Sequence, residues 1–518
     1  MSTRAVALFV CLLVVATARP GCAIEWRPPD LRPTKAVIAD VLAAYANHAG
    51  PLDARSAQRR ERWTYVNGTH RFPVDVAIRG DDYRVTVTLG GARYAAGRSG
   101  GVRWRADANG IAHATLSDEQ GDAADRVPSS VFPFALSGCR LAGESERFGA
   151  TWVLVDRPRR DKPHWLYVDR ASGAIAHEIT REGARTVVAT FDRWERAGSS
   201  RRPAHWRVSD GNPADDVDVT VDAVDAVPVA EGDVAIPQTP RLFAAPSPSP
   251  SGAIALPAHF RGRTIFVDVD VDGRPEEFVL DTGTASIMLD RRIAQRRGWQ
   301  PLLDHATVPR MRVGPLRLDD VSTLTVPLEI GYPGLGGILG YDFFFGHVVH
   351  IDYARARVEV LTREAAEPVF AGGGASVVPA SYDEGVPLVH AAFGRASGER
   401  FLLDTGSPHL FVMSGFADRY AKLLAASWPA AAFAGGRRSM EPAYLEGSIR
   451  VAAREAPEFE LGPVRFGRLT VGVEEPNGRP DAIDVPVDAI VGTDQMALFE
   501  WWFDYDGGRI AIRRNAVR

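Results

Sequence analysis

The sequence predicts a mainly β protein in which an α+β domain precedes two β-rich lobes built on one repeated unit. Three observations favour this architecture. The chain has 518 residues, more than a single domain of about 100 to 200 residues. A Pro- and Ser-rich segment at residues 244–252 interrupts it near the middle. After this segment, two apolar stretches each end in Asp-Thr-Gly, at Asp281 and Asp404.

Composition excludes several classes of protein. Hydrophobic residues make up 45 % and charged residues 24 % of the chain, as in ordinary globular proteins. The formal net charge of -5 provides no basic surface that would predict nucleic acid as a partner. Three cysteines supply neither a disulfide framework nor a cysteine-based zinc site. We therefore expect no metal and no other cofactor.

The N-terminus has the layout of a secretory signal peptide at residues 1–23. Arg4 precedes an apolar run at residues 5–15, and small residues that suit cleavage follow at Ala18 and Ala23. The run is shorter than the roughly 20 apolar residues that span a membrane. An uncleaved anchor or a lipid-modified Cys22 are the alternatives. We expect a secreted or periplasmic bacterial protein with no stable membrane span once the signal is removed.

The segment at residues 244–252 alternates Pro and Ser, which favours an extended linker that packs no core. It separates an N-terminal domain at residues 24–243 from the repeated part of the chain. We assign the first lobe to residues 253–370 and the second to residues 371–518.

The N-terminal domain is expected to combine one helix with many strands. Apolar residues at three- and four-residue spacing predict a helix over residues 34–46. Alternating patterns then predict strands, including residues 151–156 and 164–169, and a turn before residue 174 predicts a hairpin. From Trp165 to Pro240 the order of elements resembles the half-barrel of periplasmic lipoprotein carriers and related lipid-binding proteins.

The repeat carries the chemistry. Phe278-Val-Leu-Asp281-Thr-Gly-Thr284 recurs as Phe401-Leu-Leu-Asp404-Thr-Gly-Ser407. Downstream, Ile338-Leu-Gly340-Tyr-Asp342 recurs as Ile490-Val-Gly492-Thr-Asp494. An Asp-Thr-Gly triplet is expected by chance about once in 5,000 residues. Two triplets with matched elements downstream therefore indicate an internal duplication, whose second copy is 29 residues longer between the Asp and the later Gly.

This pattern suits acid–base chemistry. Each apolar strand delivers a carboxylate at its end, and Gly permits a tight turn there. Thr284 or Ser407 can donate a hydrogen bond to the outer carboxylate oxygen, and the hydroxyls of Thr282 and Thr405 can tie the two loops together. Two carboxylates a few ångströms apart hold one proton between them and titrate as a coupled pair. Such a pair can activate a water against a peptide carbonyl without a metal.

Both halves of the repeat resemble the aspartic proteases, specifically the bacterial retropepsin-like group, over about residues 254–514. The resemblance implies a two-lobed β-barrel fold and an aspartic endopeptidase activity on peptide or protein substrates. It implies a monomer, because one chain holds both lobes as an intramolecular pseudo-dimer. The positions that it implies are the catalytic pair Asp281 and Asp404; the supporting loops Thr282, Gly283, Thr284, Thr405, Gly406 and Ser407; and the bracing segments 338–340 and 490–492.

A flap over the site is expected in this group of proteases. In the second lobe, residues 434–447 could form a flap hairpin with Tyr444 as a substrate contact, or only a surface loop. In the first lobe, the corresponding residues 303–313 are short and lack a Gly-rich tip. His409 would perturb the carboxylates only if it pointed toward them, which we do not expect. Asp342 and Asp494 are interpreted as charges at helix N-termini.

Two other functions remain open at this stage. The chain could be a periplasmic lipid-, lipoprotein- or peptide-binding protein whose protease-like lobes are inactive. The N-terminal region could alternatively be an inhibitory or targeting segment that is removed on maturation, because the linker would be accessible to proteolysis.

Overall fold

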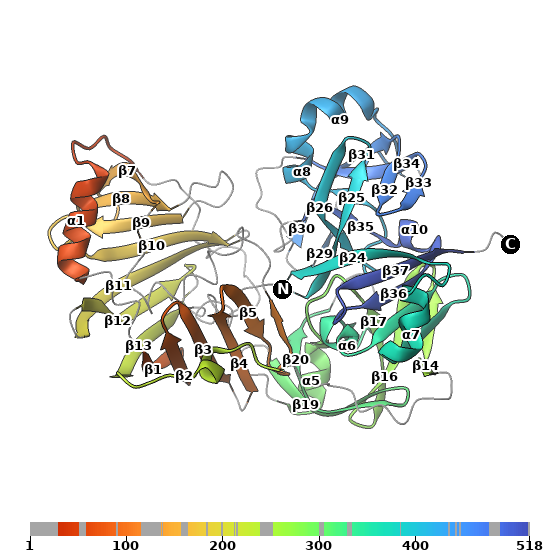
Figure 1. Cartoon of the computed structure of the whole chain (residues 1–518), viewed down its shortest axis with the longest axis horizontal. Helices are drawn as coiled ribbons and strands as arrows, with labels where there is room; N and C mark the ends of the chain where they lie inside the picture. Colours follow the sequence, from red (N-terminus) through yellow and green to blue (C-terminus); the bar gives the residue numbers. More distant parts are fainter. Residues whose placement is uncertain are drawn as a thin grey trace. The chain divides into compact units, whose positions relative to one another are not determined.

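The computed structural model describes residues 30–50, 58–89, 92–114, 136, 138–156, 164–182, 185–197, 200–211, 213, 216–238, 252–299, 305–328, 334–383, 385–433, 436–440, 443–444, 447–475 and 487–515. The predicted signal peptide and nearly all of the predicted linker lie outside these residues. The chain divides into two compact units, Thr3–Gln238 and Thr239–Arg518. Strands β1 to β13 belong to the first unit and β14 to β37 to the second (Figure 1). The prediction of a mainly β protein is confirmed.

The N-terminal unit is built on one antiparallel sheet of 13 strands. The first six strands follow one another from β1 outward to β6, the next seven run back from β7 to β13, and β13 pairs with β1. The strands are β1 (Arg59–Asn67), β2 (His70–Arg79), β3 (Asp82–Leu89), β4 (Ala92–Ser99), β5 (Val102–Ala106), β6 (Ala112–Ala114), β7 (Arg140–Ser145), β8 (Thr151–Asp156), β9 (His164–Asp169), β10 (Ile175–Glu182), β11 (Arg185–Ala197), β12 (Ser200–Ser209) and β13 (Val217–Asp225). The predicted strands at 151–156 and 164–169 are confirmed with the same bounds.

Helix α1 (Ile38–Ala49) begins four residues later than predicted and ends three residues later. It starts late because Thr34 forms a turn in which its hydroxyl accepts a hydrogen bond from Ala36 N at 3.1 Å. Val41, Tyr45 and Ala49, spaced by four residues, form its buried face. Figure 1 shows α1 alongside β7 to β10. Gly173, after β9, approaches the helix so closely that a β-carbon there would lie 2.3 Å from Ala44 O. A short helix, α4 (Glu231–Val234), closes the unit.

The second unit contains a sheet whose strands close into a six-stranded barrel, because β16 pairs with both β17 and β19. A seventh strand, β15, lies at its edge. The elements are β15 (Ala258–Arg261), β16 (Thr264–Val271), β17 (Arg274–Leu280), β18 (Met288–Asp290), α5 (Arg291–Arg296), β19 (His305–Val313), β20 (Leu316–Val326), β21 (Gly337–Leu339) and α6 (Tyr341–Phe344).

The remaining strands form a sheet of 15 strands and a two-stranded hairpin. The elements are β14 (Ala253–Ala255), β22 (Val348–Asp352), β23 (Arg357–Leu361), α7 (Arg363–Phe370), β24 (Ser376–Asp383), β25 (Val386–Phe393), β26 (Ala396–Leu403), β27 (Phe411–Val412), α8 (Ser414–Arg419), α9 (Ala421–Ser427), β28 (Ser439–Met440), β29 (Ala443–Tyr444), β30 (Gly447–Ser448), β31 (Val451–Ala456), β32 (Phe459–Leu461), β33 (Val464–Phe466), β34 (Leu469–Glu474), β35 (Ala489–Val491), α10 (Thr493–Met496), β36 (Phe499–Asp504) and β37 (Arg509–Arg514).

Each half of the repeat is tied together by its own first and last strands. In the first half β14 pairs with β23, and in the second half β24 pairs with β37. The halves join where β22 pairs antiparallel with β36. The repeated Asp352 and Asp504 end these two strands, and each carboxylate accepts a backbone N–H from three residues further on, at 2.9 Å.

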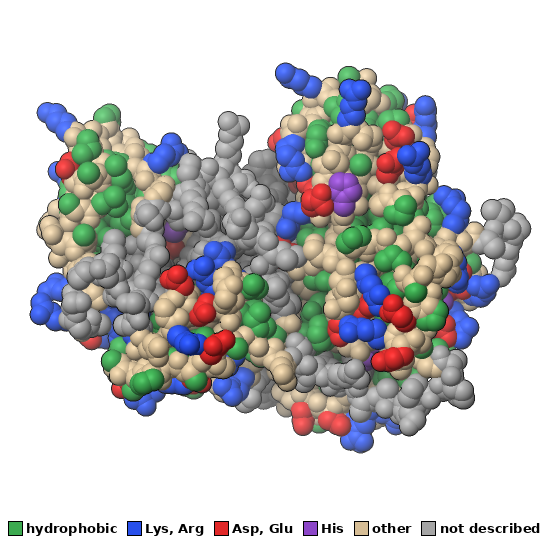
Figure 2. Space-filling view, viewed as in Figure 1, with side chains coloured by type: hydrophobic (Ala, Val, Ile, Leu, Met, Phe, Trp, Pro, Cys, Tyr) green, Lys and Arg blue, Asp and Glu red, His purple; other side chains and the backbone are tan. Residues whose placement is uncertain are grey.

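The surface carries mixed charge. Figure 2 shows acidic and basic side chains interspersed over the face in view, without a field of one sign. Within the described ranges, no helix is both long and apolar enough to cross a membrane.

Candidate functional site

The two Asp-Thr-Gly loops occupy equivalent places in the two halves. Asp281 follows β17, which pairs in parallel with β21, and Asp404 follows β26, which pairs in parallel with β35. The backbone N–H of each Asp donates to the last residue of that partner strand, Asp281 to Leu339 O and Asp404 to Val491 O, both at 3.0 Å. The loops are thus held by the segments 338–340 and 490–492 that the sequence also repeats.

Gly340 and Gly492 are needed for steric reasons. A β-carbon on Gly340 would lie 2.4 Å from the carbonyl oxygens of Thr284 and Ser286. One on Gly492 would lie 2.4 Å from His409 O and 2.6 Å from Ser407 O. The backbone of each Asp loop therefore rests directly on the glycine that crosses behind it.

Two threonines join the loops of the two halves. Thr282 Oγ1 accepts a hydrogen bond from Thr405 N at 3.0 Å and donates to Leu403 O at 2.7 Å. Thr405 Oγ1 accepts from Thr282 N at 3.0 Å and donates to Leu280 O at 2.8 Å. Both threonines are buried. Each hydroxyl is therefore fully engaged with the opposite loop, as expected from the sequence.

This junction brings the two carboxylates together. A β-carbon on Gly283 would lie 2.6 Å from Asp404 Cγ, and one on Gly406 would lie 2.6 Å from Asp281 Oδ2. Each glycine thus lets the opposite carboxylate approach its backbone. Burial raises the pKa of Asp404 well above its ordinary value, and the negative charge of Asp281 beside it adds to the effect. Asp404 therefore retains its proton at pH values where a solvated Asp has lost its own.

The hydroxyl after each triplet behaves differently in the two loops. Thr284 Oγ1 donates to Asp281 Oδ2 at 2.7 Å, as the sequence suggested. Ser407 Oγ instead donates to His409 O at 3.3 Å, and only its backbone N–H reaches Asp404, at 3.1 Å. Pro408 follows Ser407 and restricts its backbone, whereas Ala285 follows Thr284. In the first loop, the Thr284 hydroxyl thus donates to the Asp carboxylate. In the second loop, the Ser407 hydroxyl donates to a backbone carbonyl instead.

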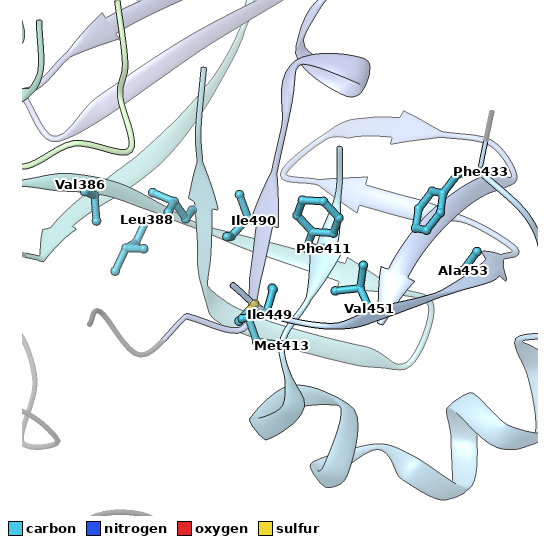
Figure 3. Packing of buried hydrophobic residues seen from close by; sticks show 10 residues of the cluster. Val386, Leu388, Phe411, Met413, Phe433, Ile449, Val451, Ala453 and Ile490 are labelled. Atoms are coloured by element: carbon cyan, nitrogen blue, oxygen red, sulfur yellow. The ribbon is translucent and has the colours of Figure 1, made fainter. Parts of the chain in front are cut away.

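Apolar side chains flank the carboxylates on both sides. Side chains alternate along a strand, so Leu402 shares the face of Asp404, and its cross-strand neighbours there are Ile490 and then Phe411. These three belong to a buried cluster with Val386, Leu388, Met413, Phe433, Ile449, Val451 and Ala453. Figure 3 shows the Phe411 ring between Ile490 and Val451.

The first half repeats this arrangement with different residues. Val279, Ile338 and Met288 are cross-strand neighbours on the face of Asp281. They pack with Phe266, Leu324, Val326, Leu328 and Leu335. The sheet face that carries each carboxylate is therefore occupied by a buried apolar cluster.

Asp342 and Asp494 lie in the first turns of α6 and α10, but they have different partners. Asp342 is buried and accepts the backbone N–H of Ile287 at 3.0 Å. Asp494 binds Arg263 and His409, the latter with 2.7 Å between His409 Nδ1 and Asp494 Oδ2. The interpretation as helix-end charges is thus incomplete, because both carboxylates also hold the loops that follow the Asp-Thr-Gly triplets.

His409 points at Asp494, and its ring stacks on Phe433 with 5.6 Å between ring centroids. The sequence did not predict that Arg263 also binds Asp494. Aligning the repeats shows only that the charge is particular to the first half, since Arg263 lies 18 residues before Asp281 and the equivalent position before Asp404 is Val386.

The predicted flap region of the second half has the backbone pairing of a hairpin. β28 pairs with β31, and within that pair Ala443 faces Ser448 and Tyr444 faces Gly447. The side chain of Tyr444 lies outside the described part of the structure, so its substrate contact stays a prediction. In the first half, β19 spans most of the corresponding residues and pairs with β20.

The sequence matches no family model and no curated protein. Among solved structures, it is similar to an aspartic proteinase from Irpex lacteus, at 12 % identity and a TM-score of 0.33, over 51 % of this chain and 98 % of that one. It is also similar to basic 7S globulin from soybean, at 11 % identity and a TM-score of 0.32, over 51 % and 95 %. A LolA superfamily protein from Nitrosomonas europaea is similar at 13 % identity and a TM-score of 0.29, over 39 % and 98 %. These similarities concern fold alone, and the TM-scores are too low to support a function.

Proposed function

We propose that this chain is an exported aspartic-type endopeptidase whose two related lobes, residues 253–370 and 371–518, share one site. The observation that carries the proposal is the pair of neighbouring carboxyl groups of Asp281 and Asp404, delivered by two equivalent loops and fixed by the reciprocal threonine bonds, with Asp404 buried and its pKa raised. The proposal that the chain is exported is based on the signal peptide predicted at residues 1–23. A secreted or periplasmic location is therefore part of the proposal.

The reaction needs one water and the two carboxyl groups. The ionised carboxylate takes a proton from the water, and the water oxygen attacks the peptide carbonyl carbon. The protonated Asp donates its proton to the carbonyl oxygen. A tetrahedral diol results. The carboxyl group that took the water proton then donates it to the peptide nitrogen, and the other carboxylate takes a proton from one hydroxyl of the diol. The C–N bond breaks, a carboxylic acid and an amine leave, and the pair again holds one proton. The raised pKa of Asp404 supports its role as the proton donor in the first step.

We propose peptides with large apolar side chains next to the cleaved bond as substrates, because the sheet faces that carry the two carboxylates are apolar. Leu402, Ile490 and Phe411 lie on the face of Asp404, and the first half offers Val279, Ile338 and Met288. The flap hairpin around Tyr444 is proposed to cover a bound peptide.

The test is hydrolysis of a peptide library by the mature protein between pH 3 and pH 8. We expect cleavage that a statine-type inhibitor blocks and that falls at least about 1,000-fold in Asp281→Asn and in Asp404→Asn, because removing one member of an acid–base pair removes proton transfer. Asp319→Asn is the matched control, since Asp319 is an exposed residue of β20 paired with Arg317. Activity that survives both substitutions at the Asp pair contradicts the proposal.

The same experiment separates catalysis from binding. A lobe pair that only held a peptide or lipid would give no cleavage at any pH, and the purified protein would carry a bound molecule detectable by mass spectrometry. Two complete Asp-Thr-Gly loops with a shared proton favour catalysis.

A further inference from the structure

A charged cluster lies beside one of the two Asp loops. The carboxylate of Asp494, in α10, is bound by Arg263 and by His409 Nδ1. Arg263 lies in the turn between β15 and β16 of the first half, whereas His409 lies in the loop that follows Asp404. Backbone bonds fix this loop against α10, from Thr493 N to Ser407 O at 2.8 Å and from Asp494 N to Pro408 O at 3.0 Å. The cluster therefore has a rigid relation to the carboxylate pair.

The equivalent place in the other half is uncharged apart from one buried carboxylate. The residues at the repeat positions of Arg263 and His409 are Val386 and Ser286. The counterpart of Asp494 is Asp342, which is 0 % exposed and holds the backbone of Ile287. At these three repeat positions, solvent-exposed charged groups thus lie beside the second Asp loop and not beside the first.

The cluster is open to solvent and has donors to spare. The side chains of Arg263, Asp494 and His409 are 50 %, 36 % and 28 % exposed. A guanidinium has five N–H donors, and Asp494 engages one nitrogen of Arg263, so donors remain for a second anion. Arg437 and Arg438 are two further exposed cations nearby. Phe433, on which the His409 ring stacks, donates its backbone N–H to Arg437 O, and Arg438 is the next residue.

We propose that Arg263 and His409, held in place by Asp494, bind an acidic side chain of the peptide substrate and so fix the direction in which the peptide lies over the site. This inference rests on the proposed endopeptidase function and adds a substrate class to it: peptides that carry Asp or Glu on one side of an apolar cleavage site. Asp494 is a positioning residue in this scheme, because it orients both donors.

The contribution of His409 depends on pH. Burial and the charge of Arg263 lower its pKa, so the ring is neutral near pH 7. It then donates through Nδ1 to Asp494 and presents Nε2 as an acceptor, which does not bind a carboxylate. Below that pKa, Nε2 also becomes a donor. The groups that face the ring are Asp494 from α10, Arg263 from the β15–β16 turn, and the apolar Phe433 and Phe411.

The test compares matched peptides that differ by Glu or Gln at each position flanking an apolar cleavage site. At one position we expect kcat/KM to be about tenfold higher for the Glu peptide, which corresponds to about 1.4 kcal/mol. Arg263→Gln should bring this Glu/Gln ratio to within about twofold of unity. Asp494→Asn should lower the ratio, because the amide has a single acceptor oxygen and no longer holds both donors in place. In the wild type the ratio should rise on acidification from pH 7, and His409→Ser should abolish that rise.

Arg261→Gln is the control, because Arg261 lies on β15 near Arg263 but pairs with Glu277; its ratio should match the wild type. If Arg263→Gln does not fold, the wild-type ratio measured at low and high salt decides, since salt screens an exposed ionic contact. A ratio of unity at every position, an unchanged ratio in folded Arg263→Gln, or no effect of salt overturns the inference alone. Absence of hydrolysis for every peptide overturns the proposed function as well.

Discussion

The two halves of the C-terminal unit share their Asp loops and differ in what surrounds them. In both, an apolar strand ends at an Asp, a parallel strand ends behind it, and a Gly without room for a side chain supports the loop. The first half reaches that Gly in 59 residues and the second in 88, because the second half has α9 and the strands β28 to β30 between α8, the counterpart of α5, and β31. The backbone support and the threonine junction are thus duplicated, whereas the hydroxyl partners of Thr284 and Ser407 differ, as do the partners of Asp342 and Asp494.

The supporting glycines provide the strongest test of this equivalence. We expect Gly340→Ala and Gly492→Ala each to destabilise the unit by about 3 kcal/mol or more, because the added methyl group would meet two carbonyl oxygens. Their φ angles are -102° and -93°, which any residue adopts, so the cost is steric. Urea unfolding followed by tryptophan fluorescence measures it. Gly415→Ala in α8 is the control, since its β-carbon would meet nothing within 4 Å.

The threonine junction should respond equally from either side. Thr282→Val and Thr405→Val each remove one donor and one acceptor and leave a buried N–H without its partner. A loss of about 2–3 kcal/mol is expected for each. The two values should agree within about 1 kcal/mol in the same unfolding experiment. A large effect at one threonine and none at the other would show that the halves are not equivalent at this level.

The hydroxyls after the triplets should separate the halves. Thr284→Val removes a hydrogen bond to the Asp281 carboxylate, whereas Ser407→Ala removes a bond to the carbonyl of His409. We expect about a tenfold loss of kcat/KM in Thr284→Val and less than about a twofold loss in Ser407→Ala. Because the lost bond stabilised an ionised carboxylate, the acidic limb of the pH profile should move to higher pH in Thr284→Val only. Equal losses in the two variants would contradict the assignment.

The smallest effect concerns stability and pH. The pKa of Asp404 is raised in the folded protein, so its stabilising contribution is present at low pH and is lost as pH rises through that pKa. Asn mimics the protonated form at all pH values. We therefore expect Asp404→Asn to melt a few degrees above the wild type at pH 7, at about 2–4 °C per kcal/mol for a unit of this size, and to match it near pH 3. A Tm difference that does not change with pH would show that Asp404 carries no such penalty.

Much of the C-terminal unit was predictable because its signals are local. A strand, a triplet and a later apolar-apolar-Gly segment are visible in the sequence, and the repeat shows that they belong together. The sequence did not reveal which hydrogen-bond or ion-pair partner a side chain has when that partner depends on the folded loop. The Ser407 hydroxyl donates to His409 O, a partner that depends on the shape of the loop next to Pro408. The pairing of Arg263 with Asp494 joins residues 231 positions apart.

For the N-terminal unit, the combination of one long helix with many strands was predicted, as were several individual strands. The bounds of the helix were predicted less well. The helix expected over residues 34–46 begins at Ile38, since a hydroxyl turn at Thr34 competes with helical bonding. The order of its sheet, in which β13 returns to pair with β1, is set by contacts between strands distant in sequence.

The way each half is closed has a kinetic consequence. The first half is sealed by β14 on β23 and the second by β24 on β37, so the covalent connection between the halves is the short stretch between α7 and β24. This stretch is a short linker, so each half is held at a high effective concentration relative to the other. Cutting it would turn assembly of the site from a first-order into a second-order process, and activity would then depend on protein concentration as in a dimer.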